Sequence, residues 1–347
     1  MMIPTQIRVP SLVRIKPGAL DRLGVYLARE KHDHVLVFAS PLPEHIGQRA
    51  RQALSSAGVS FVWKTVDSNS FEQAVRLFAE LGKGVRAIVG IGGGKALDMA
   101  KYIAFLARLA YTAVPTSLSN DGFCSPQSSL TMDGKRRSLP SALPQGVVLD
   151  IDVCLGAPKV LWLSGVGDLV SKLTAVVDWK LAFHTVKEPV NDLAALLSDA
   201  TVYQFLGAPG FDREGTTLLA NALMLNGIAM EICGSSRPAS GSEHLVSHAL
   251  DASSARPRLH GLQVGMATYI CSRLQGKQSD IIKTLFDRTG FWDAVREDPF
   301  SLDEWLRAFE LAPTIKEGYF TILSLQDCQS AAKDILRGDP VLSGCFV

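Results

Sequence analysis

The stretch Arg86–Gln127, RAIVGIGGGKALDMAKYIAFLARLAYTAVPTSLSNDGFCSPQ, decides the fold of this chain. It begins with a short apolar run, Ala87–Ile91, which predicts a buried strand. Three glycines, Gly92–Gly94, follow at once, and apolar residues then recur at helical spacing from Ala96. A strand, a glycine turn and a helix in this order present backbone N–H groups to a phosphate. A tight turn without a ligand has the same pattern, so the glycines alone leave two interpretations open.

A second predicted strand, Tyr111–Val114, follows this helix and leads into a polar loop. The loop, Pro115–Gly122, reads PTSLSNDG and is dense in hydroxyl and amide side chains. Polar loops directly after strands are the usual place for ligand contacts. The glycine turn and the polar loop together favour a ligand site over a turn that only reverses the chain.

The segments before this stretch alternate between strand and helix patterns. Strands are predicted at His34–Phe38 and Ser60–Val66, and helices at Pro43–Ala57 and Phe71–Leu81. Such alternation is typical of a doubly wound, mostly parallel sheet with helices on both faces. Ligands of these sheets bind at the carboxyl ends of the strands, where both loops lie.

The pattern changes near Pro158. Before it, a hairpin is predicted around Asp133-Gly134, and a further strand at 146–151. After it, helical periodicity dominates. We therefore expect two domains, an α/β domain at residues 1–158 and an all-helical domain at residues 159–347. The helices of the second domain are predicted at 165–182, 190–206, 212–233, 240–251, 259–274, 277–289, 291–296, 302–310 and 326–336.

The composition argues against several classes of function. The formal net charge is +1, with no basic or acidic block, so we expect neither nucleic acid nor an anionic membrane as a partner. No uninterrupted apolar run reaches membrane-spanning length, and the charged, proline-containing N-terminus does not resemble a signal peptide. The six cysteines are scattered without a CxxC pair, which predicts reduced thiols and a cytoplasmic protein.

The helical half holds a second set of candidate residues. Asp168, within GVGDL, is predicted in the first turn of a helix, where the helix dipole alone would stabilise a carboxylate by about 0.3–1 kcal/mol. His244 and His248 lie four residues apart, on one face of a predicted helix. His260 begins the next predicted helix. One carboxylate and several imidazoles suit a Zn²⁺-type ion with an open coordination position.

The clustering of histidines supports this interpretation. The chain has seven histidines, and three of them fall between positions 244 and 260. Asp168, His244 and His260 together favour a metal site over three unrelated structural roles. For His248, a ring satisfied by a hydrogen bond and a metal ligand are equally supported.

Five motifs occur in order along the chain: GIGGGKALDMAK, VPTSLSNDGFCSP, GVGDLVSKLTA, SGSEHLVSHALD and HGLQVG. Together they resemble the sn-glycerol-1-phosphate dehydrogenase family, within the superfamily of glycerol dehydrogenase, iron-type alcohol dehydrogenase and dehydroquinate synthase. The resemblance implies a dehydroquinate synthase-like fold, in which a Rossmann-like nucleotide-binding domain precedes a helical domain that binds metal and substrate. It also implies NAD(H) or NADP(H) and one divalent metal, usually zinc, with nickel or iron as alternatives.

The resemblance implies roles for individual residues. It assigns cofactor contacts to the glycine turn and the polar loop, at Gly92, Gly93, Gly94, Lys95, Ala96, Leu97, Asp98, Thr116, Ser117, Leu118, Ser119 and Ser125. It assigns the metal to Asp168, His244 and His260. Substrate contacts fall on Asp121, Asp168 and His248, and Asp168 and His248 are also the expected catalytic residues.

The implied activity is the interconversion of dihydroxyacetone phosphate and sn-glycerol 1-phosphate by hydride transfer, with the metal as a Lewis acid on the ketone oxygen. His248, or a metal-bound water, is the expected proton relay. A related polyol or sugar-phosphate dehydrogenase, a sugar-phosphate cyclase (a lyase) and a catalytically silent nucleotide-binding protein stay open as alternatives. No acid follows the strand at His34–Phe38 to hold a ribose hydroxyl, so NAD versus NADP also stays open. We expect a homo-oligomer that acts on a small phosphorylated substrate.

Overall fold

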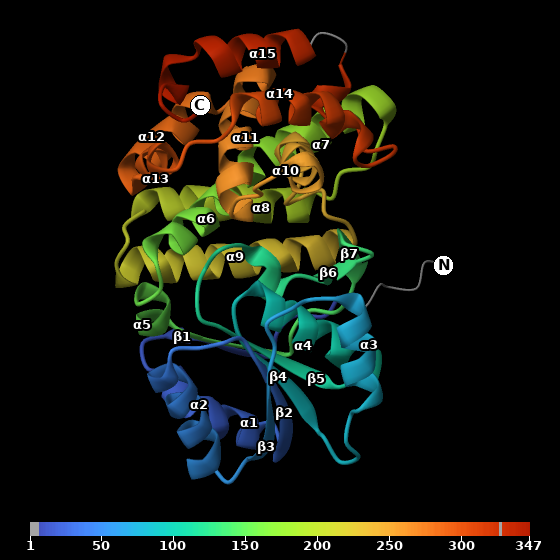
Figure 1. Ribbon diagram of the computed structural model, residues 1–347, viewed down its shortest axis with the longest axis vertical. Helices are drawn as coiled ribbons and strands as arrows, with labels where there is room; N and C mark the ends of the chain where they lie inside the picture. Colours follow the sequence, from blue (N-terminus) through green and yellow to red (C-terminus); the bar gives the residue numbers. More distant parts are fainter. Residues whose placement is uncertain (1–6, 326–327) are drawn as a thin grey trace. The chain divides into compact units, whose positions relative to one another are not determined.

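The computed structural model describes residues 7–325 and 328–347. Contacts divide the chain into two compact units, and the division falls between Ala157 and Pro158 (Figure 1). The first unit is built on a parallel sheet, and the second is mostly helical. The fold class expected from the sequence is therefore confirmed.

Six parallel strands form the main sheet of the first unit. They are β1 (Leu12–Lys16), β2 (His34–Ala39), β3 (Ser60–Thr65), β4 (Ala87–Gly92), β5 (Ala110–Pro115) and β8 (Gly146–Asp150). Their order across the sheet is β1-β8-β5-β4-β2-β3. The chain thus moves from β2 to β3 toward one edge, and from β4 to β5 toward the other. Such a reversal places a ligand crevice between the carboxyl ends of β2 and β4.

Helices cover both faces of this sheet, because consecutive strand residues point to opposite faces. In β2, Val35, Val37 and Ala39 belong to one core with the helices α1 and α2, while Leu36 and Phe38 belong to another with α3 and α4. The helices of the unit are α1 (Leu23–Arg29), α2 (Glu44–Ser56), α3 (Phe71–Ala79), α4 (Gly94–Ala107) and α5 (Ile151–Leu155), with 3-10 turns at Leu20–Arg22 and Asp121–Cys124.

The predicted hairpin is present as a separate two-stranded sheet of β6 (Gln127–Met132) and β7 (Lys135–Pro140). Its two turn residues, Asp133 and Gly134, have φ angles of 50° and 73°. Positive φ at both central residues is the requirement of the type I′ turn, and an Asp-Gly pair meets it.

Helices make up most of the second unit. They are α6 (Lys159–Val170), α7 (Lys172–Val186), α8 (Asp192–Gly207), α9 (Arg213–Cys233), α10 (Ser242–Ser253), α11 (His260–Gln275), α12 (Ser279–Thr289), α13 (Phe291–Glu297), α14 (Leu302–Leu311) and α15 (Cys328–Gly338), with 3-10 turns at Ala312–Thr314, Ile322–Ser324 and Pro340–Leu342. The helix predicted at 326–336 corresponds to α15, and its positions 326 and 327 lie outside the described residues.

The prediction of a single helix at 165–182 is wrong. Two helices, α6 and α7, occupy this region, and α6 begins six positions earlier, after Pro158. The start escaped prediction because Pro158 carries no capping side chain and α6 is apolar around most of its circumference. As a consequence, Asp168 lies in the last turn of α6 and not in the first turn of a helix.

Two helical stretches, 159–186 and 213–233, are long and apolar enough to cross a membrane by length and composition alone. Within their apolar windows, 83% and 56% of the residues are buried inside the fold. Core helices of folded proteins pass the same test.

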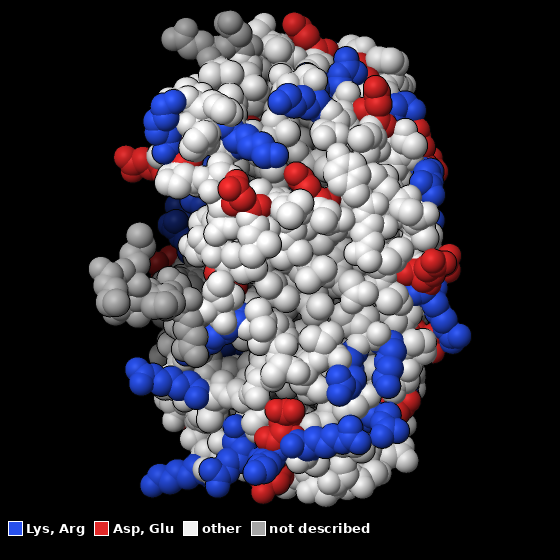
Figure 2. Space-filling view, turned by 180° about the vertical axis from the view of Figure 1, so that it is seen from behind, with Lys and Arg blue, Asp and Glu red and all other residues white. Residues whose placement is uncertain are grey.

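The surface carries charges of both signs. On the face shown in Figure 2, basic and acidic side chains both occur, and a broad area carries neither.

Candidate functional site

The three glycines after β4 differ in whether packing requires them. Gly92 has a φ of 132°, and a Cβ there would lie 2.0 Å from Ser40 Oγ, so this position requires glycine. Gly93 caps α4 and Gly94 is its first residue, and a Cβ at either would meet no atom within 4 Å. Packing therefore does not require these two glycines. Their effect is to keep open the space in front of the helix N-terminus.

A pocket of about 380 Å³ lies at this turn and is lined by Ser40, Pro41, Val66, Asp67, Gly93, Gly94 and Lys95. These residues follow β2, β3 and β4, so the pocket sits at the crevice that the strand order creates. No side chain caps α4 at Gly93, which leaves its first backbone N–H groups available to an anion. Asp67 is a polar residue of this pocket that the sequence did not reveal, because it follows β3 and not the strand next to the glycine turn.

The polar loop after β5 is attached to the glycine turn and to α4. Thr116 N donates to Gly92 O at 3.2 Å. The buried Lys101 ammonium lies 2.7 Å from Gly122 O, 3.3 Å from Ser125 Oγ and 3.3 Å from Asp98 Oδ1. Lys101 therefore ties the loop to the helix that begins at the glycine turn.

The predicted cofactor residues of these two segments differ in accessibility. Lys95 and Gly94 are exposed, and Thr116, Ser117, Ser119 and Asp121 are half-buried. Leu118 and Ser125 are buried, and the Ser125 hydroxyl donates to Gln127 O at 3.0 Å. Ala96 and Leu97 belong to the first turn of α4, and their side chains are buried. Burial raises the pKa of Asp98, although Lys101 beside it acts in the opposite direction.

The second unit brings the three predicted metal ligands together. Asp168 comes from α6, His244 from α10 and His260 from α11, and one ligand atom of each lies within 4.8 Å of the others. His244 Nε2 lies 3.5 Å from Asp168 Oδ1, and His260 Nε2 lies 3.9 Å from the same oxygen. One carboxylate and two imidazoles with converging nitrogens form a donor set that fits a divalent transition metal.

Two glycines beside the ligands permit this convergence. A Cβ on Gly167 would lie 2.0 Å from Gly261 O, and a Cβ on Gly261 would lie 1.8 Å from Ser164 O. The backbones of α6 and α11 are therefore in direct contact where the helices cross, and this contact brings Asp168 close to His260. The glycines stand in GVGD and HG, next to the predicted ligands Asp168 and His260.

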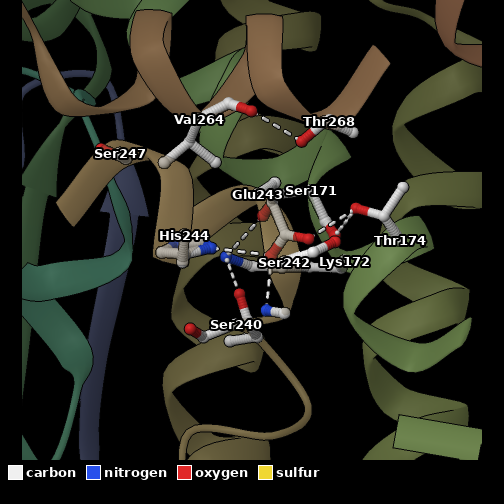
Figure 3. Close-up of polar contacts among 12 residues, drawn as sticks. Ser171, Lys172, Thr174, Ser240, Ser242, Glu243, His244, Ser247, Val264 and Thr268 are labelled. Atoms are coloured by element: carbon white, nitrogen blue, oxygen red, sulfur yellow. Dashed lines mark hydrogen bonds and ion pairs between the residues drawn. The ribbon is translucent and has the colours of Figure 1, made fainter. Parts of the chain in front are cut away.

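Each of the two predicted ligand rings has a polar contact at its other nitrogen. His244 Nδ1 lies 2.9 Å from Glu243 Oε1, and His260 Nδ1 lies 3.3 Å from Ser247 Oγ. Figure 3 shows Glu243 between His244 and Thr174, whose hydroxyl donates to Glu243 Oε2 at 2.9 Å. Such contacts orient metal-binding imidazoles. Glu243 escaped the sequence analysis because the direction of its side chain depends on the packing of α7 against α10.

The charge of Asp168 is stabilised by neighbours and not by a helix dipole. At the C-terminal end of α6 the dipole disfavours a carboxylate. Burial also acts to raise the pKa of Asp168, but Lys172, His244 and His260 outweigh it and hold the pKa well below the usual range. The Lys172 ammonium is fully buried and lies 3.3 Å from Asp168 Oδ1 and 3.2 Å from Ala239 O.

His248 lies beside the ligand cluster, one turn along α10 from His244. Its ring centroid is 6.4 Å from that of His244 and 6.2 Å from that of His260, and the residue is half-buried.

Asp178, from α7, is another buried carboxylate near this site. It lies beside the start of α10, where Ser242 N donates to it at 2.7 Å. Burial, and then the negative charge of Glu243, raise the pKa of Asp178 to about 6.

Comparison with known proteins shows the family to which this chain belongs. Residues 14–158 match the family model of iron-containing alcohol dehydrogenases. A glycerol-1-phosphate dehydrogenase (NAD(P)+) of Aeropyrum pernix is 34% identical over 95% of this chain and 96% of its own length. Proteins of the same name from Methanothermobacter thermautotrophicus and Staphylothermus marinus are 33% and 36% identical, over 93% and 92% of this chain and 94% and 92% of theirs.

Solved structures show the same fold at low sequence identity. A probable glycerol dehydrogenase from Sinorhizobium meliloti aligns with a TM-score of 0.74 at 18% identity, covering 96% of this chain and 99% of that one. An iron-containing alcohol dehydrogenase from Thermotoga maritima aligns with a TM-score of 0.70 at 16% identity, covering 96% and 98%. Because relatives above 30% identity match 92–95% of its length, the chain belongs to the glycerol-1-phosphate dehydrogenase family and is an NAD(P)-dependent oxidoreductase.

Proposed function

We propose that this enzyme interconverts dihydroxyacetone phosphate and sn-glycerol 1-phosphate by hydride transfer with NAD(P)H, and that it uses one zinc ion held by Asp168, His244 and His260. The observation that carries the proposal is the convergence of two imidazole Nε2 atoms on one carboxylate oxygen. The names of relatives that match most of the chain supply the substrate.

The donor set supports zinc among the divalent metals. Imidazole and carboxylate suit Zn²⁺, which binds such sites more tightly than Fe²⁺ does. Three protein ligands leave a coordination position for substrate. A bound ion at this site would supply Lewis acidity to the substrate carbonyl.

Other residues are proposed to bind the cofactor, contact the substrate and transfer the proton. The N–H groups at the start of α4 and the Lys95 ammonium bind the cofactor phosphates, and Thr116–Ser119 form the second wall of that site. Asp121 contacts the substrate. His248 delivers a proton to the substrate oxygen as the hydride arrives, and takes it back in the oxidation direction.

Replacement of His248 by alanine is expected to lower kcat by about 10²-fold or more, because general acid–base catalysis contributes typically ~10²–10⁴-fold. Metal content is expected to stay at the wild-type level, since His248 is not one of the three converging ligands. Stopped-flow turnover and elemental analysis of the same preparations test both parts. His45→Ala, at an exposed histidine of α2, is the control. Unchanged turnover in His248→Ala would remove the proposed role.

Asp67 is expected to favour NADH over NADPH. Its carboxylate lines the pocket at the glycine turn, where it would accept hydrogen bonds from ribose hydroxyls and repel a 2′-phosphate. Asp67→Ser is expected to raise the NADPH/NADH ratio of kcat/KM by roughly tenfold, about the effect of one charge-assisted hydrogen bond. Lys95→Ser, in the same pocket, is the matched comparison and is expected to weaken both cofactors. An unchanged ratio in Asp67→Ser would place the ribose elsewhere.

The overall proposal is tested by oxidation of NADH and NADPH with dihydroxyacetone phosphate, before and after chelation, with zinc, nickel and iron added back. Chelator-sensitive turnover restored by zinc is the expected result. Turnover with another polyol or sugar phosphate, and not with dihydroxyacetone phosphate, would replace the proposed substrate by that compound. Substrate conversion without net NADH consumption would identify a cyclase, and NADH binding without any conversion would identify a silent nucleotide-binding protein.

We also propose that the enzyme is a cytoplasmic homo-oligomer. Large apolar side chains are exposed on α8, where Leu193 and Leu196 are 58% and 66% accessible. Exposed apolar residues gathered on one helix are typical of surfaces that contact another protein chain. The absence of disulfides among the six cysteines fits a reducing compartment.

A further inference from the structure

Glu243 is held in one position by three contacts. It is fully buried in the first turn of α10. One carboxylate oxygen accepts from Gly241 N at 2.6 Å and lies 2.9 Å from His244 Nδ1, while the other accepts from Thr174 Oγ1 at 2.9 Å. A carboxylate fixed by a backbone N–H and by a hydroxyl on another helix cannot follow the imidazole if the ring turns.

The contact selects the tautomer of His244. An ionised carboxylate only accepts hydrogen bonds, so His244 Nδ1 must carry the proton in this contact. The lone pair of a neutral ring is then on Nε2, which faces Asp168. The contact of His260 differs, because the Ser247 hydroxyl at its Nδ1 can donate or accept and does not select a tautomer. Glu243 therefore prepares His244 as a ligand in a way that Ser247 does not prepare His260.

The negative charge of Glu243 is not needed for its structural contacts. A glutamine in the same position could accept from Gly241 and His244 through its carbonyl and donate to Thr174 through its amide. The Glu243 carboxylate also lies close to the Asp178 carboxylate. A Cβ on Gly241 would contact both, at 2.8 Å from Asp178 Oδ2 and 2.9 Å from Glu243 Oε2. Two buried carboxylates at one helix end repel each other, and a cation beyond the imidazole would offset that repulsion.

We propose that Glu243 is a positioning residue of the metal centre, which fixes the tautomer and direction of His244 and strengthens its bond to the metal through negative charge. The inference rests on the proposed metal function of Asp168, His244 and His260. It adds a determinant of metal affinity that makes no contact with the metal itself.

The test compares Glu243→Gln, Glu243→Ala and the control Asp178→Asn in the full chain. Zinc affinity is measured by competition with a chromophoric chelator. The His244 tautomer is measured by ¹⁵N NMR of the imidazole in the metal-free protein at a pH high enough to make the ring neutral, because burial acts to lower the pKa of His244 but Asp168 and Glu243 outweigh it and raise that pKa. We expect affinity to fall about tenfold in Glu243→Gln and about 100-fold in Glu243→Ala, the range known for outer contacts of metal ligands. The Nδ1–H tautomer is expected to dominate in the wild type and to lose that dominance in Glu243→Ala.

Asp178→Asn separates orientation from general charge. Asp178, from α7, is also buried beside the start of α10, where it accepts from Ser242 N, Gln275 Nε2 and Ile322 N. None of these donors is an imidazole, so the loss of its charge is expected to leave zinc affinity within about threefold of wild type. An equal loss of affinity in Asp178→Asn and Glu243→Gln would overturn the proposal, as would wild-type affinity in both Glu243 variants. Glu243→Gln keeps the contacts and decides the question if the alanine variant does not fold. A wild-type protein that binds no zinc would instead refute the metal function itself.

Discussion

Asparagine at position 168 is expected to abolish stoichiometric metal binding and to lower kcat/KM by at least about 10³-fold, because Lewis-acid stabilisation contributes several kcal/mol to such reactions. The substitution keeps the shape of the side chain but removes the charge on which both histidine Nε2 atoms converge. It also leaves the buried Lys172 ammonium without its carboxylate, which is expected to lower the free energy of unfolding of the metal-free protein by about 3 kcal/mol. Elemental analysis, steady-state kinetics and urea unfolding measure the three effects.

The double variant Asp168→Asn/Lys172→Met separates stability from chemistry. Removing the unpaired ammonium is expected to restore most of the lost unfolding free energy, since replacing both members of a buried pair is far less costly than replacing one. Metal binding and turnover are expected to stay absent. An Asp168→Asn enzyme with full zinc content and wild-type turnover would show that the ion, if any, binds elsewhere.

Alanine at position 94 is expected to weaken NADH binding by at least about tenfold while leaving the fold intact. A Cβ on Gly94 meets no protein atom within 4 Å, so it would project into the space in front of the α4 N-terminus, where a phosphate must approach the backbone. The same change is expected to raise stability slightly, by about 0.4–1 kcal/mol, because alanine restricts the unfolded chain. Loss of affinity together with a preserved or higher melting temperature is the expected signature.

Two other glycines provide the comparison for Gly94→Ala. Gly92→Ala is expected to cost about 2–4 kcal/mol of stability, because its φ of 132° and the 2.0 Å approach to Ser40 Oγ leave no room for a Cβ. Gly207→Ala, in α8, also meets open space and is expected to leave NADH binding unchanged. Wild-type NADH affinity in Gly94→Ala would place the cofactor phosphates away from the glycine turn.

The first unit was largely predictable because its signals are local. A glycine run directly after the apolar strand at Ala87 marks both the end of β4 and the start of α4. The Asp133-Gly134 pair likewise specified its hairpin turn. Asp67 was missed because its place in the pocket depends on β2 pairing with both β3 and β4, and strand order is not written in any one segment.

In the second unit, the sequence indicated the three candidate metal ligands but not the residues that support them. Asp168, His244 and His260 stand in motifs, yet their convergence depends on helices far apart in sequence. The start of α6 was missed because no capping residue marks it, and with it the true place of Asp168 near the helix end. Lys172 and Glu243 were missed because a buried charge is recognised only by the partner that tertiary packing brings to it.

The ion pair between Asp168 and Lys172 has a consequence for how the enzyme acquires its metal. All three ligands belong to the second unit, and the lysine provides Asp168 with a counter-charge before any ion arrives. We therefore expect the protein to fold without the proposed zinc ion, in contrast to small domains that are unfolded without one. We also expect an ion at the proposed centre to be taken up by the folded protein, and its identity to follow the metal supply of the cell that makes the enzyme.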